Sequence, residues 1–294
     1  MNNTKATLIA IFTVIVWGST FATIRAAFEG GYTPGHLLLV RYLIASSLFI
    51  IYALFNRSKF RLPKKEDILQ IFFLGLIGIS VYHMGVTFGE QTVEAGTAGM
   101  IIGSGPIFTS ILAVFLLKER LGKSGWIGMF IGFIGLVFIL LGTSDKGFNF
   151  SSGVYLILIA AFSTSLMFVF QKRLLNKYSP MELTAYFTWA GTIPFLFFAP
   201  GILEALPTIT MEAHLTAIYA GIFPGAIAYV TWSMALKAGN ASTVSSYLYA
   251  EPVVAIIISW LWLNELPSTL SIIGGIIAIG GVIIVNTFSK KTST

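Results

Sequence analysis

The sequence contains no cysteine and few charged residues. Without cysteine there is no disulfide framework, no thiolate metal ligand and no cysteine nucleophile. Only 10% of the 294 residues are charged, whereas a soluble domain carries roughly 25%, because its surface faces water. The shortage of charge therefore indicates that most of this protein's surface faces something other than water.

Several catalytic and cofactor patterns are also missing. The only histidines are His36, His83 and His214, and none are spaced as a metal-binding pair. Gly122-Lys123-Ser124 matches the end of a phosphate-binding loop, but Leu117 stands where that loop has its first glycine. The apolar stretches hold no cluster of carboxylates and no Ser–His–Asp arrangement. We therefore expect no metal, no cofactor, no ATP-driven step and no enzymatic activity.

Long apolar stretches are what the sequence has in abundance. Hydrophobic residues make up 56% of the chain, and the mean hydropathy is +0.85. Because a helix needs about 20 apolar residues to cross the hydrocarbon core of a bilayer, we expect an all-α integral membrane protein with ten transmembrane helices. The predicted spans are 6–28, 35–55, 67–90, 95–117, 123–142, 151–171, 180–200, 213–236, 241–263 and 268–288. The first is too long for the apolar core of a signal peptide, so we expect it to be retained.

The basic residues predict the orientation of these spans. With the N-terminus inside, fifteen of the 18 lysines and arginines fall in inner segments, and Lys146 alone falls in an outer loop. Arg25 and Arg41 lie within spans. Since positive charge favours the cytoplasmic side, we expect both termini to be cytoplasmic. The net charge of +6 then reflects topology and lipid-headgroup contact, and no nucleic-acid partner is expected.

The two halves of the chain resemble each other. A shift of 146 residues aligns four pairs of identical residues, namely Pro34 with Pro180, Gly75 with Gly221, Pro106 with Pro252 and Glu119 with Glu265. We therefore predict two repeats, 1–146 and 147–294, with five spans each. Because five is odd, the second repeat would be inverted, and substrate in such proteins sits near the midplane between the repeats. This arrangement favours transport across the bilayer; the alternative is a duplication that serves stability alone.

Local motifs add a family resemblance. Two segments resemble the EamA-type branch of the drug/metabolite transporter superfamily. They are Trp17-Gly18-Ser19-Thr20-Phe21 and the segment from Thr97-Ala98-Gly99 through Pro106 to Leu117-Lys118-Glu119-Arg120-Leu121. A second copy runs from Ala241-Ser242-Thr243 to Glu265. The resemblance implies a ten-helix secondary transporter with a central cavity, commonly an exporter of amino acids or other small metabolites. Ser163 stands where the first half has Trp17, so the two halves are not chemically equivalent.

Glu251 is the acidic residue closest to the centre of a predicted span. At that depth a carboxylate costs about 2.5–3.5 kcal/mol. It either carries a proton or binds a substrate amine, or else it belongs to a buried ion pair or bonds backbone groups freed by Pro252. Tyr247 lies four residues earlier on the same helix face. The first-half counterpart of Glu251 is Gly105, so the predicted cavity is asymmetric here.

A basic side chain and several aromatic ones are the other candidates. Arg41 either binds a substrate carboxylate through its fork of donors or pairs with Glu251. Arg25, nearer the outer end, can extend to the membrane interface. Trp17 lies away from both interfacial belts and is either a cavity wall or packing.

The third and eighth spans carry a related set of polar aromatic residues. Tyr82 and His83 lie in the outer half of the third span, and the repeat places Tyr229 at the position of His83. Tyr229 shares a helix face with Trp232. His83 either hydrogen-bonds a ligand or takes up a proton. The alternative is that these side chains only fill the core.

Taken together, the sequence predicts a multi-pass secondary transporter in the cytoplasmic membrane of a bacterial cell. We expect it to export a small metabolite, with amino acids as the leading class and protons as a candidate coupling ion. The predicted substrate-binding residues are Trp17, Arg41, Tyr82, His83, Tyr229, Trp232, Tyr247 and Glu251. An importer of a small metabolite or a nucleotide-type solute is the alternative. A membrane enzyme acting on a lipid-linked substrate would need a carboxylate cluster at one interface, which the sequence does not offer.

Overall fold

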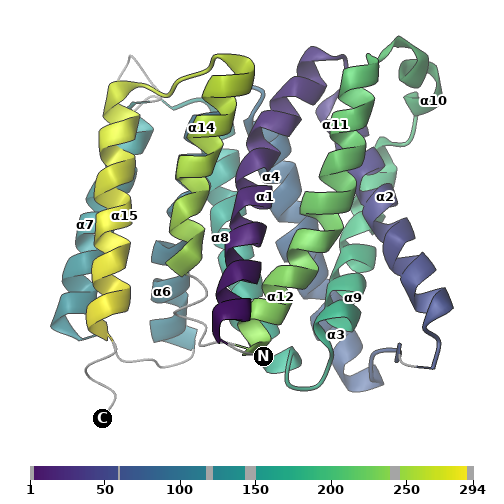
Figure 1. Ribbon diagram of the computed structural model, residues 1–294, viewed down its shortest axis with the longest axis horizontal. Helices are drawn as coiled ribbons and strands as arrows, with labels where there is room; N and C mark the ends of the chain where they lie inside the picture. The colour runs from purple at the N-terminus through teal and green to yellow at the C-terminus, as the bar shows by residue number, and fades with distance from the viewer. Residues whose placement is uncertain (1–2, 59, 117–121, 143–149, 239–245, 290–294) are drawn as a thin grey trace.

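The computed structural model describes residues 3–58, 60–116, 122–142, 150–238 and 246–289, and every regular element in these ranges is helical. Figure 1 shows the longer helices standing side by side in one bundle, with the start of α1 and the end of α15 at the same end of it. The uninterrupted long helices are α1 (Asn3–Glu29), α2 (Pro34–Phe55), α7 (Lys123–Leu141), α8 (Ser152–Leu174) and α15 (Thr269–Ser289).

Six helices in the described part of the chain are long and apolar enough to cross a membrane. A seventh span results if the bent pair Pro180–Phe198 and Ile202–Thr208, which meet at 77°, is counted as one. Glu251–Leu263 and Thr269–Gly281 are shorter apolar helices. The all-helical membrane class is therefore confirmed, whereas the number of ten spans stays a prediction.

Two of the spanning helices contain a π-helical segment. The first runs from α3 (Lys65–Gly75) through η1 (Leu76–Val81) into α4 (Tyr82–Gly89), and the second from α11 (Met211–Ile222) through η4 (Phe223–Ile227) into α12 (Ala228–Ala238). A π-helical turn widens the helix locally and is frequent at functional sites. Both segments lie near the middle of their span.

The predicted fourth and ninth spans are not continuous α-helices, which corrects the sequence-based expectation. The fourth consists of α5 (Ala95–Gly103) and α6 (Gly105–Leu116), and the described part of the ninth consists of η5 (Ser246–Ala250) and α14 (Glu251–Leu263). The physical reason is proline at the second position of each new helix, Pro106 and Pro252. Proline lacks a backbone N–H and clashes with the preceding turn, so it is tolerated where a helix starts.

Capping residues explain where the second and seventh predicted spans begin. The Thr33 hydroxyl accepts a hydrogen bond from the His36 N–H at 3.2 Å, at the start of α2. Ser179 caps α9 (Pro180–Thr192) in the same way, accepting from the Glu182 N–H at 3.2 Å. In both helices the capping residue is followed by proline, which fits the first helical position. After α9 the chain continues as η2 (Ile193–Phe198), α10 (Ile202–Ala205) and η3 (Leu206–Thr208).

Helices α7 and α15 pack with their backbones in close contact and lie side by side at one edge of the bundle in Figure 1. A β-carbon added at Gly135 would lie 2.3 Å from the Ala278 backbone nitrogen. One added at Gly281 would lie 2.3 Å from the Gly132 nitrogen. Small residues at this spacing let membrane helices approach closely.

Candidate functional site

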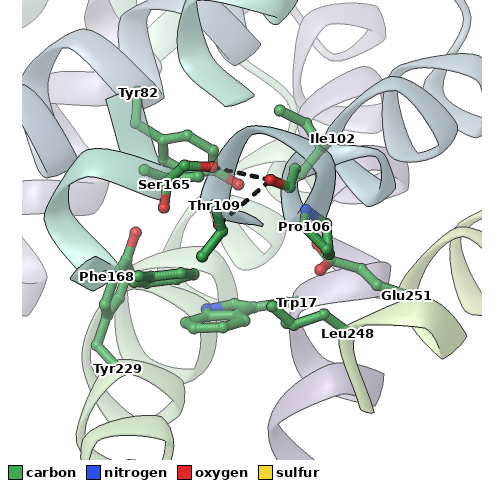
Figure 2. Close-up of a pocket in the computed structure, with 12 residues that line it drawn as sticks. Trp17, Tyr82, Ile102, Pro106, Thr109, Ser165, Phe168, Tyr229, Leu248 and Glu251 are labelled. Carbon is green, nitrogen blue, oxygen red and sulfur yellow. Dashed lines mark hydrogen bonds between the residues drawn. The ribbon is translucent and has the colours of Figure 1, made fainter. Parts of the chain in front are cut away.

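A cavity lies where the breaks in the fourth and ninth spans meet α1, α4, α8 and α12 (Figure 2). The free space between its side chains, including its open side, is about 440 Å³. Its walls combine aromatic and aliphatic side chains with a few hydroxyls and one carboxylate. They are Trp17, Tyr82, Ile102, Gly105, Pro106, Thr109, Thr164, Ser165, Phe168, Tyr229, Leu248 and Glu251. This mixture suits an amphipathic small molecule.

The first turn of α6 is hydrogen-bonded to α8 beside this cavity. The Gly105 carbonyl accepts hydrogen bonds from the Ser165 hydroxyl at 3.0 Å and from the Thr109 hydroxyl at 3.2 Å, as the dashed lines in Figure 2 show. Ser165 also donates to the Ala161 carbonyl of its own helix at 2.8 Å. Helix α8 therefore fixes the position of the break in the fourth span.

Trp17 forms one wall of the cavity and is held by several contacts. Its Nε1 donates to the Pro224 carbonyl in η4 at 3.3 Å. Its ring lies nearly parallel to that of Phe168, with centroids 6.3 Å apart (Figure 2), and 5.1 Å from that of Tyr229. Trp232 packs behind it at 5.3 Å and is only 1% exposed. Of these two predicted tryptophans, Trp17 lines the cavity and Trp232 supports it.

His83 and Tyr229 contact each other directly. The His83 Nε2 and the Tyr229 hydroxyl are 3.0 Å apart, and both side chains are buried. His83 also packs against the rings of Tyr82 and Tyr42, with centroid distances of 4.6 and 4.9 Å. It lines a smaller recess, shared with Trp17 and Tyr82, that adjoins the main cavity.

Glu251 and Arg41 are both buried, and the structure does not pair them. Glu251 is 5% exposed and lines the cavity as the first residue of α14. Arg41 is 0% exposed, and none of its guanidinium nitrogens has a hydrogen-bond partner in the protein. No ion pair within 4.0 Å joins them among the described residues. The Arg41–Glu251 pair, which the sequence left open, is therefore not formed.

Tyr247 is placed in η5, half-buried, and packs against the apolar core formed partly by Trp232 and Tyr229. It is not among the residues lining the cavity. Sequence reasoning missed Phe168, Ser165 and Thr109 of the cavity wall, because none of them has a feature that separates it from other span residues. The co-registered prolines at 106 and 252 were the one signal that marked this region.

An ion pair joins helices at the opposite end of the bundle from the start of α1. Arg25 Nε donates to Glu265 Oε1 at 2.9 Å, and Arg25 Nη1 donates to the Glu90 carbonyl at 2.9 Å. Glu265 Oε2 also accepts from the Ala95 N–H at 3.3 Å, so it caps α5. Glu265 precedes α15 in the chain, yet the helix that it caps belongs to the first half. Its counterpart Glu119 lies outside the described residues.

Comparison with known proteins gives a consistent result. The EamA-like transporter family matches twice, at residues 4–141 and 151–287. The "Uncharacterized transporter YdfC" of Bacillus subtilis is 40% identical, covering 91% of this chain and 86% of that protein. A "Probable terminal-alkyne amino-acid exporter" of Streptantibioticus cattleyicolor is 30% identical, covering 97% and 95%.

A solved crystal structure matches the whole length of both chains with a TM-score of 0.70 at 22% identity, which shows a shared fold. The family and the relatives' names make the chain a transporter rather than an enzyme. The family match extends over both halves of the chain and accounts for the apolar helices around the cavity. The chain belongs to the EamA-like transporter family.

Proposed function

We propose that the protein is a secondary transporter that exports small amphipathic metabolites, with amino acids as the leading class. The observation that carries the proposal is the cavity at the two helix breaks, where aromatic walls surround a buried carboxylate. Aromatic side chains suit the apolar part of an amino acid, and hydroxyl and carboxylate groups suit its polar part. The amino-acid exporter named among the relatives supports the same class for this chain.

We propose further that residues 1–146 and 147–294 are inverted five-helix repeats in a ten-span fold. Equivalent landmarks support it, because α6 and α14 begin 146 residues apart, as do α7 and α15. His83 and Tyr229 are also 146 residues apart, yet they touch each other. Equivalent residues of two repeats meet only near the axis that relates them. The cavity then lies beside that axis.

Within this cavity we assign substrate contact to Trp17, Tyr82, Tyr229 and Glu251, which line it together. His83 lines the adjoining recess and orients the Tyr229 hydroxyl. Trp232 acts through Trp17, since it packs behind that ring. Glu251 is the candidate proton carrier, because a carboxyl group inside a membrane protein crosses between conformations at lower cost when it is neutral. The substrate contact of Tyr247 stays a prediction.

Replacing Trp17 by alanine should lower exchange of the transported amino acid about tenfold. The variant loses ring contacts worth roughly 0.5–1.5 kcal/mol each, of the kind an aromatic wall offers a substrate. The measurement is exchange of radiolabelled L-amino acids across proteoliposomes that hold the purified protein. Trp126→Ala is the matched control, since Trp126 of α7 is 51% exposed on the outside of the bundle. Equal exchange by both variants, or no exchange of any amino acid by the unaltered protein, would contradict the assignment.

The topology prediction places both termini and residue 58 in the cytoplasm and residue 144 outside. Ser58→Cys, Ser144→Cys and Thr292→Cys each introduce a single thiol into this cysteine-free chain. A membrane-impermeant maleimide added to intact cells should label only Ser144→Cys. After the cells are opened, it should label the other two. Labelling of Ser58→Cys or Thr292→Cys in intact cells would reverse the orientation.

A further inference from the structure

One face of α4 carries a buried polar stripe that the cavity does not account for. His83, Thr87 and Glu90 follow each other at spacings of four and three residues, which places them on the same side of the helix. All three are buried, and Thr87 and Glu90 are 0% exposed. The Thr87 hydroxyl and both Glu90 carboxylate oxygens have no hydrogen-bond partner within the protein. Unpartnered buried polar groups are rare in native proteins and call for an explanation.

Helix α2 faces this stripe and brings a second unpartnered charge. The ring of Tyr42 lies 4.9 Å from that of His83, so this part of α2 packs against the stripe. The neighbouring Arg41 is fully buried, with all three guanidinium nitrogens unpartnered. Its side chain should lean toward the start of α2, as helical side chains do. That direction is toward the end of α4, where Glu90 lies, because Gly35 of α2 and Phe88 of α4 both lie beside Phe198.

The two charges lie on facing helices without touching. Helices α2 and α4 pack against each other, and the Tyr42–His83 ring contact holds Arg41 on the side of the polar stripe. The Arg41 nitrogen and Glu90 oxygen atoms are nevertheless not within 4.0 Å, since no such pair occurs among the described residues. A buried charge without a direct partner is strongly destabilising. A ligand with one anionic and one cationic group would bind Arg41 and Glu90 at the same time. Its carboxylate would accept two parallel hydrogen bonds from the guanidinium group, and its ammonium group would donate to the Glu90 carboxylate.

The pair also lies between the cavity and the far end of the bundle. His83 lines the recess beside the main cavity, and Glu90 is two turns further along the same helix. Beyond it, the Glu90 carbonyl accepts from Arg25, which is in turn paired with Glu265. Arg41 and Glu90 are thus placed after the central cavity and before the ion pair that joins the helix ends. In the proposed orientation this end is the extracellular one.

We propose that Arg41 and Glu90 form an outer subsite that binds a zwitterionic amino acid by both of its charged groups. The α-carboxylate binds Arg41 and the α-ammonium group binds Glu90. The inference rests on the proposed function in taking amino acids as the substrate class, and it adds a second binding place on the exit side of the cavity.

The test uses three probes that share the phenylalanine side chain and differ in their charged groups. L-Phenylalanine has both groups, N-acetyl-L-phenylalanine lacks the ammonium group and L-phenylalaninamide lacks the carboxylate. Calorimetric titration of the purified full-length protein should show at least tenfold tighter binding of L-phenylalanine than of either derivative. Glu90→Gln should remove the preference over the N-acetyl form only. Arg41→Gln should remove the preference over the amide only.

Glu94→Gln is the matched control, because Glu94 is an exposed carboxylate in the connection between α4 and α5. This variant should keep both preferences. Should Glu90→Gln and Arg41→Gln keep both preferences while the protein still binds and exchanges L-phenylalanine, the subsite is wrong and the proposed function stands. Failure of the unaltered protein to bind or exchange any L-amino acid would overturn both proposals.

A further variant covers the case in which these two charge variants do not fold. Thr87→Cys retains both charges and places a thiol on the stripe beside Glu90. L-Phenylalanine should slow its reaction with N-ethylmaleimide at least threefold, and N-acetyl-L-phenylalanine should not. Gln91→Cys is the control, since Gln91 is exposed in the connection between α4 and α5. It should react with N-ethylmaleimide at the same rate whichever of the two compounds is present. Equal rates for Thr87→Cys with and without L-phenylalanine would contradict the subsite.

Discussion

Transport driven by a pH gradient is expected to fall at least tenfold when Glu251 is replaced by glutamine, while amino-acid exchange without a gradient stays within about threefold. Glutamine keeps the size and hydrogen bonding of the carboxyl group but can neither bind nor release a proton. Glu251 lines the cavity, so substrate and proton would meet at the same place. The measurement is uptake and exchange of L-phenylalanine in proteoliposomes with and without an imposed pH difference.

The same variant separates a proton carrier from a structural charge. If Glu251 were held in a buried ion pair, its replacement would leave the partner unpaired and lower stability by roughly 3–5 kcal/mol. No described basic residue lies within 4.0 Å of it, so the unfolding temperature of Glu251→Gln should stay close to that of the unaltered protein. Glu212→Gln, an exposed carboxylate at the start of α11, is the control.

Two results would contradict the proton-carrier role. One is unchanged pH-driven transport by Glu251→Gln. The other is equal loss of driven transport and exchange together with a lowered unfolding temperature. That second result would assign Glu251 a structural role.

The parts of the fold and of the site that depend on local sequence features were predictable. The spans at 6–28, 35–55 and 123–142 agree with helices in the structure because length and hydropathy decide them. Trp17 and Glu251 were identified by depth, since an indole or a carboxylate in the middle of an apolar stretch is unusual. Both line the cavity.

The features that depend on tertiary contacts were not predictable. Proline at 106 and 252 is compatible with a kinked helix as well as with a break. Only tertiary packing decides between them, and here α6 packs against α8 whereas α14 packs against α1 and α5. Glu90 stands at the end of a predicted span, where a carboxylate is normally exposed to water. In the structure Glu90 is 0% exposed, and its carbonyl accepts a hydrogen bond from Arg25 of α1.

The second prediction concerns the stability of the protein and two adjacent glycines of α15, Gly280 and Gly281. Gly281→Ala should lower the free energy of unfolding by about 1–3 kcal/mol, the usual range for overpacking. A β-carbon there would lie 2.3 Å from the Gly132 nitrogen and 2.6 Å from the Gly128 carbonyl oxygen. Because both are backbone atoms, no side chain can rotate away, and α7 and α15 must separate. Thermal unfolding of the purified protein, followed by tryptophan fluorescence, measures the change.

Gly280→Ala provides the control one residue away. A β-carbon at Gly280 would meet nothing within 4 Å, so this variant gains only the helix preference of alanine over glycine, roughly 0.5–1 kcal/mol at most. Its unfolding temperature should stay the same or rise, although the chemical change is identical. If both alanine variants lower the unfolding temperature equally, the loss comes from glycine's backbone freedom, and close packing between α7 and α15 is not what these glycines provide.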